Sequence, residues 1–294
     1  MPLLPTDRAL SGTRTPGPER RTLSVGPWSV AFEGLDPETA LRLDRRWGGF
    51  VGPEEAEDVS AAARLLDAGP GSFLEAAPGE GYRFEATGAE VVSYHFAARR
   101  GEGERWRVAV AASEDEPRER TLDNLARLLV ARLALRSGGL ALHGAGVLLA
   151  GNAFVFAGPS RAGKSTAARL ARADASLGDD FAVVVPRDDG YAAVAVPFDN
   201  SERGPAVARV APSPLAGIFR LEKSADARIE PLAGAAAIAS LVGCAAFPWA
   251  LPDLAGGLLP VAEAVVGAGL FSVLRFGPAT DVRALIDLDR SPQW

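Results

Sequence analysis

A phosphate-binding loop is indicated by residues 158–165, GPSRAGKS, which fit the pattern G-x-x-x-x-G-K-[ST] without a mismatch. In such a loop the glycines let backbone N–H groups turn toward a phosphate, and the following helix points its positive dipole end at the same anion. Lys164 would supply a mobile charge to the outer phosphates, and Ser165 an oxygen to Mg²⁺. We therefore expect a run of consecutive residues to bind the phosphates of a nucleotide: Gly158, Pro159, Ser160, Arg161, Ala162, Gly163, Lys164, Ser165 and Thr166.

Two adjacent carboxylates, Asp179 and Asp180, open the strand-like segment DDFAVVV after Gly178. Phosphoryl transfer needs a carboxylate that helps to hold Mg²⁺ and a group that orients or deprotonates the nucleophile. We expect one of the two carboxylates to help hold Mg²⁺ and the other to act as the base. The alternative is an ordinary polar turn, of the kind that residues 188–190, DDG, predict further along the chain.

The chain has two histidines, and of its 31 basic residues only Lys164 and Lys223 are lysines. One of these lysines falls at the loop position that needs a compact ammonium, which argues against a chance match. His143 lies in LALHGAG, on the strand that leads toward the loop, and is either a site residue or a buried polar residue. His95, in SYHF, is expected to be structural.

The segments around the loop predict the elements that must position it. LALHGAGVLLAG and AFVFAG predict a hairpin turning at Gly151-Asn152, and a helix is expected from the loop to about residue 172. Further along we expect two strands joined at residues 188–190, a strand pattern with turns over 213–230, a buried helix over about 233–245, a strand over LFSVLRFG and a helix over TDVRALIDL.

Residues 21–116 predict a smaller N-terminal α+β domain without a recognisable catalytic motif. DPETALRLDRRW predicts a helix with Asp36 as N-cap and Pro37 at its first position, and YRFEAT, EVVSYHFAAR and RWRVAVAAS predict an antiparallel meander. DVSAAARLLDAG fits either a helix or a turn, and TLDNLARLLVARLALR a clear helix. The best boundary lies near residue 117, so that residues 117–294 form the nucleotide-binding domain. Residues 1–20 are expected to be a mobile tail.

The segments LHGAGVLLAG, FAGPSRAGKST and SLGDDFAVV resemble the C-terminal catalytic domain of HPr kinase/phosphorylase, and most closely the HPr-kinase-like proteins often found beside peptide-modification genes. The resemblance covers roughly residues 118–290. It implies a nucleotide domain related to that of phosphoenolpyruvate carboxykinase, within a chain that is α/β and α+β overall. It also implies base and Mg²⁺ roles for Asp179 and Asp180, a hydrogen bond from His143 in the same site, and self-association.

Three features depart from that family. Arg161 stands where glycine is usual, Thr166 replaces a common glutamate, and the family's E-x-R-G-x-G segment is echoed only by Glu202-Arg203-Gly204. In the resembled enzymes that segment engages the carrier-protein substrate, so its loss leaves the acceptor open. We expect Arg161 to adjust phosphate affinity or salt sensitivity rather than the chemistry.

Composition narrows the functional classes. The net charge of −6 argues against nucleic-acid binding and against an anionic membrane surface. Residues 231–252 are uncharged but Ala-rich and interrupted by prolines, so we expect no membrane span. The single cysteine, Cys244, excludes an internal disulfide and fits a reducing cytoplasm. No signal-peptide pattern is present at the N-terminus.

The leading hypothesis is a kinase that uses ATP and Mg²⁺ to phosphorylate a hydroxyl of a peptide, a protein or a small molecule. Its catalytic residues are Lys164, Asp179, Asp180 and His143, with Ser165, Asp179 and Asp180 around the metal. In this hypothesis Asp179 orients or deprotonates the acceptor, and Asp180 and Ser165 place Mg²⁺. The alternative is a non-catalytic ATP-binding regulatory module. An ABC-type ATPase is disfavoured because no LSGGQ-like segment exists. A carboxykinase is disfavoured because the chain is short and lacks a second set of metal-binding residues.

Overall fold

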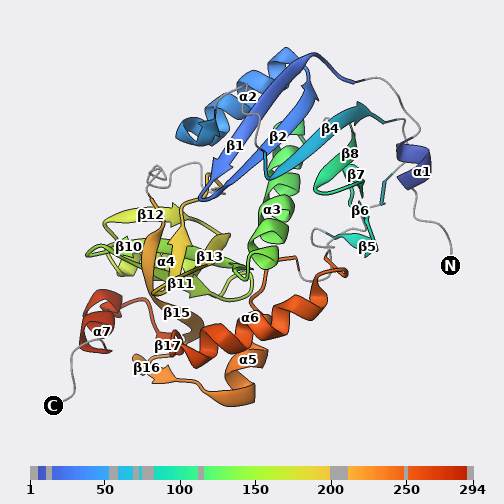
Figure 1. The fold of residues 1–294 in the computed structure, drawn as a ribbon. Coiled ribbons are helices and arrows are strands. Elements are labelled where there is room, and N and C mark those ends of the chain that lie inside the picture. Colours follow the sequence, from blue (N-terminus) through green and yellow to red (C-terminus); the bar gives the residue numbers. More distant parts are fainter. Residues whose placement is uncertain are drawn as a thin grey trace. The chain divides into compact units, whose positions relative to one another are not determined.

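The computed structural model describes residues 6–10, 15–52, 59–68, 73–74, 83–111, 116–198, 211–247 and 251–289, in which two sheets and several helices form an α+β arrangement (Figure 1). This confirms the expected α+β class. The chain divides into two compact units, Met1–Leu133 with Phe247–Ala255, and Ala134–Ala246 with Gly256–Trp294. The division lies later than the boundary expected near residue 117, because most of helix α3 packs in the first unit.

The first unit is built on an eight-stranded sheet with the order β3-β1-β2-β4-β8-β7-β6-β5. Strand β4 pairs in parallel with β2 on one side and with β8 on the other. The other pairs are antiparallel. The segment that fitted either a helix or a turn is strand β4, buried between β2 and β8. The strands are β1 (Glu19–Val25), β2 (Trp28–Leu35), β3 (Val51–Gly52), β4 (Ala61–Asp67), β5 (Glu85–Thr87), β6 (Glu90–Val92), β7 (Phe96–Arg100) and β8 (Arg105–Val110).

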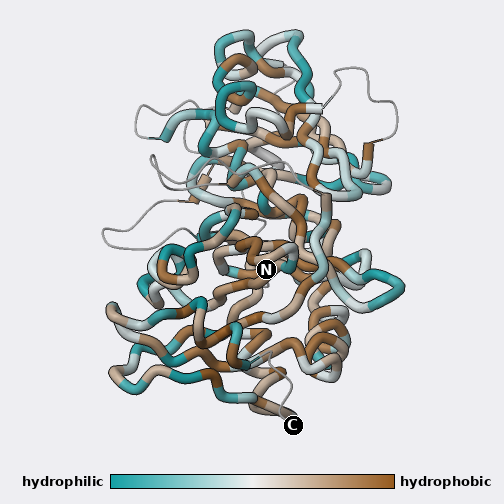
Figure 2. Tube along the Cα trace, turned by 90° about the vertical axis from the view of Figure 1, so that its left-hand side faces the viewer, coloured by the Kyte–Doolittle hydropathy of each residue, from teal (hydrophilic) through white to brown (hydrophobic). Residues whose placement is uncertain are grey.

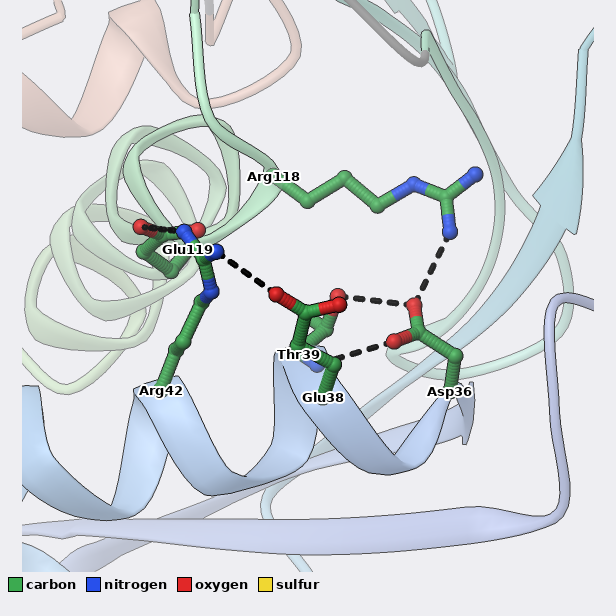
Figure 3. A network of polar contacts seen from close by, with 6 residues as sticks. All are labelled: Asp36, Glu38, Thr39, Arg42, Arg118 and Glu119. Atoms are coloured by element: carbon green, nitrogen blue, oxygen red, sulfur yellow. Dashed lines mark hydrogen bonds and ion pairs between the residues drawn. The ribbon is translucent and has the colours of Figure 1, made fainter.

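Two helices of this unit, α2 (Pro37–Trp47) and α3 (Arg118–Arg136), are joined by charged side chains (Figure 3). As expected, Asp36 caps α2: its carboxylate accepts from the Thr39 N–H at 2.9 Å. The same carboxylate contacts Arg118 at 2.9 Å, and Arg42 bridges to Glu119 at 3.2 Å. A one-turn 3-10 helix, η1 (Gly48–Phe50), follows α2.

A buried cation holds α3 to the sheet and to the returning segment Phe247–Ala255. The Arg132 side chain is 3% exposed, donates to both oxygens of Glu104 at 3.0 and 2.8 Å, and contacts Asp253 at 2.8 Å. Asp253 also pairs with Arg100 at 2.9 Å. Two carboxylates therefore compensate one buried guanidinium, which is the condition under which a buried charge is tolerated.

The expected mobile tail is corrected for its described residues. Helix α1 (Thr6–Ala9) precedes β1, and Ala9 and Leu10 are buried at 1% and 5% exposure. They pack in a hydrophobic cluster with residues of β4, β6, β7 and β8, namely Leu66, Val92, Ala97 and Ala109. The composition of this segment suggested disorder, but its two apolar side chains cover a sheet face.

The second unit is built on a nine-stranded sheet with the order β12-β10-β11-β15-β14-β13-β9, in which β17 also pairs with β15 and with β16. Strands β11, β15 and β17 are parallel neighbours, and the other pairs are antiparallel. The strands are β9 (Leu140–Leu142), β10 (Gly144–Leu149), β11 (Asn152–Ala157), β12 (Ala175–Gly178), β13 (Ala182–Arg187), β14 (Gly190–Val194), β15 (Ser213–Lys223), β16 (Arg228–Pro231) and β17 (Phe271–Phe276).

One face of the parallel strands carries the core beneath α4 (Lys164–Leu170) and α7 (Val282–Asp289). Aromatic rings from β11, β15 and β17 dominate it, and Phe154 and Phe219 stack with centroids 6.0 Å apart. Figure 2 shows hydrophobic and hydrophilic stretches alternating along the Cα trace. The helix after the loop is therefore anchored by apolar packing on its sheet side.

Most elements expected in this unit are present. The β10–β11 hairpin turns at Ala150-Gly151, one residue earlier than expected, and both turn residues have positive φ, as a tight two-residue hairpin requires. Helix α5 (Gly234–Val242) buries only one side, with Ala237 and Leu241, so the fully buried helix expected there is corrected.

Helix α6 (Ala255–Gly267) was not expected, because Pro260 and two glycines argue locally against a helix. Among the described residues, no helix combines the length and the apolar character needed to cross a membrane.

We predict that Asp36→Ala lowers the free energy of unfolding of the chain by about 1–2 kcal/mol, because it removes both the helix cap and an ion-pair partner of Arg118. Chemical denaturation monitored by circular dichroism measures the change. The matched control is Glu38→Ala, which removes an exposed pair with Arg42 and should cost less than about 0.5 kcal/mol. Equal effects of the two substitutions would contradict the assignment.

Candidate functional site

The loop 158–163 leaves the end of β11 and enters α4, at the carboxyl edge of the parallel strands, where ligands of α/β sheets bind. Gly163 has φ of 101°, and a Cβ there would lie 2.9 Å from the Phe276 ring. This glycine is required by both its conformation and the close approach of the core. Arg161 also has positive φ, at 64°, although it carries a side chain.

Lys164 lies beneath the loop with its side chain only 6% exposed. Its Nζ donates to the carbonyls of Gly158 and Pro159, each at 3.2 Å, and lies 3.0 Å from Asp180 Oδ1. The loop backbone and one carboxylate therefore compensate a nearly buried ammonium group.

Asp180 receives two donors. His143 Nε2 lies 2.7 Å from the same Oδ1 that contacts Lys164. Burial by itself raises the pKa of Asp180, but the hydrogen bonds from His143 and Lys164 outweigh it and lower the pKa to about 2. The Asp180 carboxylate is consequently ionised at neutral pH. Its backbone has φ of 63°, a conformation that Asp and Asn tolerate better than most residues.

His143 sits between β9 and β10 and is fixed by its backbone on both sides. Its N–H donates to the carbonyl of Cys244 at 2.8 Å, and its own carbonyl accepts from the N–H of Gly158 at 3.1 Å. The first residue of the loop, the histidine and the segment after α5 are thereby held in one chain of backbone hydrogen bonds.

Asp179 faces the hydroxyl of Ser165, which lies 3.1 Å from each carboxylate oxygen. The Asp179 N–H donates to the carbonyl of Phe198 at 3.3 Å. The preceding Gly178 has φ of 150°, and a Cβ there would lie 2.5 Å from a methyl group of Val196. Crowding by Val196 therefore requires glycine at the residue from which the chain turns into the Asp pair.

The structure divides the two carboxylates differently from the sequence expectation. Ser165 was expected to share a metal with Asp180, but its hydroxyl contacts Asp179, and Asp180 instead contacts Lys164 and His143. The strand-like register of the sequence could not show this, because both residues lie in the bend between β12 and β13 rather than in a strand.

A pocket of about 260 Å³ opens over the loop. Most of the expected binding residues line it, together with both carboxylates: Ser160, Arg161, Gly163, Lys164, Ser165, Thr166, Asp179 and Asp180. Gly158 and Pro159 contribute carbonyls to Lys164, and Ala162 packs against the core.

Other candidate residues fall elsewhere. His95 lies in the turn between β6 and β7 of the first unit, with its ring 6.4 Å from that of Tyr94. The segment Glu202-Arg203-Gly204 lies outside the described residues. Sequence reasoning missed the Cys244 carbonyl that holds His143, and no signal could have found it, because any residue can offer a backbone carbonyl. Burial raises the pKa of the Cys244 thiol itself.

The residues present fit a nucleotide phosphate with Mg²⁺. The Ser165 hydroxyl and the Asp179 carboxylate offer oxygen ligands on one side, and the Lys164 ammonium lies on the other. Mg²⁺ usually keeps several waters and takes one or two protein carboxylates plus phosphate oxygens. The part of the chain that the structure describes contains no group of three His, Cys, Asp or Glu residues that would hold a metal unaided.

The family described as SynChlorMet cassette protein ScmC matches residues 114–252. The matched range contains the loop, both carboxylates, His143 and Cys244. Among curated proteins, none matches the chain.

We predict that Asp180→Asn destabilises the protein at pH 7 by about 1–2 kcal/mol, because the buried ammonium of Lys164 loses its carboxylate. The lowered pKa of Asp180 stabilises the fold above its ordinary value of 3.8, and this contribution disappears as the pH falls toward 2. The difference between variant and wild type should therefore shrink between pH 4 and pH 2, as urea titrations at several pH values would measure. Asp179→Asn is the control and should show a smaller difference, because the Asp179 carboxylate contacts the Ser165 hydroxyl and compensates no buried cation among the described contacts.

Proposed function

We propose that this chain is a phosphotransferase that uses ATP and Mg²⁺ to phosphorylate a hydroxyl group. The observation that carries the proposal is that Lys164 and Asp180 meet beside the Ser165–Asp179 pair in one pocket above the loop, with His143 in contact with the Asp180 carboxylate. A site that only bound nucleotide would need the loop and Lys164. It would not need a second carboxylate held by a histidine where an acceptor could lie.

The proposed roles follow from the contacts. Bound MgATP would supply the γ-phosphoryl group, and ADP would be the leaving group. Ser165 and Asp179 hold the metal, because their oxygens already face each other at 3.1 Å. Lys164 and the loop amides bind phosphate oxygens, and these charges are worth most in a site from which water is largely excluded.

Asp180 is proposed to accept the hydrogen bond of the acceptor hydroxyl. As the hydroxyl oxygen bonds to phosphorus and the bond to the diphosphate breaks, the hydroxyl proton passes to the Asp180 carboxylate and then to solvent. A carboxylate with a pKa of about 2 is a weak base. In a loose transition state, however, the acceptor hydroxyl must mainly be oriented, and its proton need not be removed early. His143 keeps the carboxylate oriented.

Lys164 connects the two halves of the site. A phosphate group that draws the ammonium away from Asp180 removes one of the two hydrogen bonds that lower the pKa of that carboxyl. Asp180 would then keep its contact with His143 and have room for a second donor, the acceptor hydroxyl.

The proposed function also concerns the fold of the second unit and the identity of the acceptor. The parallel strands β11, β15 and β17 within a mixed sheet support a nucleotide domain like that of phosphoenolpyruvate carboxykinase, as the resemblance to HPr-kinase-like proteins implies. The acceptor hydroxyl belongs to a peptide, a protein or a small molecule in the cytoplasm. The matched family's description as a cassette protein supports an acceptor made by a neighbouring gene.

We predict that γ-labelled ATP with Mg²⁺ transfers label to a hydroxyl acceptor, tested against serine-containing peptides encoded near the gene and a panel of small alcohols. Asp180→Asn should lower transfer by at least about a hundredfold, in the range that a lost general base or orienting group costs. ATP binding without transfer to any acceptor would support the alternative, a non-catalytic regulatory module. Release of label only as free phosphate would indicate an ATPase instead.

The division of roles between the carboxylates predicts distinct effects of matched substitutions. Asp179→Asn should raise the Mg²⁺ concentration that gives half-maximal ATP binding by about tenfold, because a metal ligand loses its charge. Asp180→Asn should leave that concentration within about twofold, since its carboxylate faces Lys164 and His143. Titrating Mg²⁺ into each protein with a fluorescent ATP analogue measures both. The reverse pattern would restore the assignment of the metal to Asp180.

A further inference from the structure

Arg161 occupies a backbone conformation that costs free energy for any residue with a side chain. Its φ is 64°, in the left-handed region that glycine adopts without strain. Four other non-glycine residues share positive φ among the described residues, and one of them, Asp180, lines the same pocket: Ala150, Arg172, Asp180 and Phe247. Residues with such strained backbones concentrate at functional sites, so the Arg161 side chain is a candidate functional group.

The charged side chains that line the pocket support a role for the Arg161 side chain in binding an anion. Lys164 is nearly buried and already contacts two carbonyls and Asp180. Arg161 is exposed, lines the pocket, and makes no ion pair within the described ranges. The pocket therefore contains a second cation that is not committed to a carboxylate of the described chain.

The place of Arg161 limits which anion it can meet. It belongs to the loop itself, three residues before Lys164, and it lines the pocket together with Asp179 and Asp180. These carboxylates mark the end of the proposed nucleotide site where the phosphate is transferred. A guanidinium offers several N–H donors in a plane that matches phosphate oxygens.

We propose that Arg161 contacts the outermost phosphate of a bound nucleoside triphosphate and makes the site prefer a triphosphate over a diphosphate. The inference rests on the proposed nucleotide site but not on phosphate transfer. Arg161 is thus a specificity residue of the loop, and the strain of its backbone is retained because a glycine there would lose the charge.

The test measures binding and needs no turnover. Dissociation constants for ADP and for a non-hydrolysable ATP analogue, each with Mg²⁺, are compared for wild type, Arg161→Gly and Arg172→Gly. Arg172 is the matched control, because it also has positive φ, at 50°, and its side chain is 78% exposed with an ion pair to Asp281 outside the pocket. Both glycine variants should melt at an unchanged or higher temperature, since glycine relieves the strain.

Arg161→Gly should lower the preference for the triphosphate by about tenfold, which corresponds to one charge-assisted contact, and the loss should diminish at high salt. Arg172→Gly should leave the preference unchanged. An equal loss of affinity for both nucleotides, or an unchanged preference, would overturn the inference.

The two proposals fail separately. If the preference falls as expected and no acceptor is phosphorylated, the transferase proposal fails and the role of Arg161 stands. If wild type phosphorylates an acceptor and Arg161→Gly keeps its preference, only the role of Arg161 fails. Absence of nucleotide binding by wild type would overturn both.

Discussion

The ammonium of Lys164 is almost withdrawn from water and lies 3.0 Å from Asp180 Oδ1. Burying a charge costs several kcal/mol unless other groups compensate it, and here two loop carbonyls and one carboxylate do so. The rest of the site follows from this requirement. The chain must turn sharply after β12 to bring Asp180 within reach of Lys164, which accounts for a crowded glycine before the Asp pair and a left-handed backbone within it.

The scaffold meets the requirement with backbone hydrogen bonds as much as with side chains. Gly158, His143 and Cys244 are far apart in sequence, yet they are joined in series by two N–H···O contacts of 3.1 and 2.8 Å. Such contacts position a histidine without depending on the identity of its neighbours. The aromatic core under α4 then fixes the other side of the loop, where Phe276 leaves no room for a Cβ at Gly163.

Local patterns of the sequence predicted the loop and the hairpin before it, because both depend on short-range spacing. The same patterns predicted that Lys164, Ser165 and the two carboxylates lie together. The pairing of Ser165 with Asp179 was not predicted, since it depends on a bend whose direction is set by Phe198 and Val196, which pack from a later segment. Strand β4 and helix α6 were missed for the same kind of reason. The segment of β4 is a strand because it is buried between β2 and β8. The segment of α6 has an Ala- and Gly-rich composition and an internal proline, which gave no helix signal.

The segment Phe247–Ala255 belongs to the first unit, while the residues on both sides of it belong to the second. A fragment beginning at residue 134 would carry Asp253 away from Arg132, leaving in the remaining piece a guanidinium, 3% exposed, with Glu104 as its remaining carboxylate. The second unit, which contains the loop, is therefore not a self-contained fragment when the chain is cut at residue 134. A continuous fragment that spans the second unit would carry a segment whose ion pairs lie in the first unit.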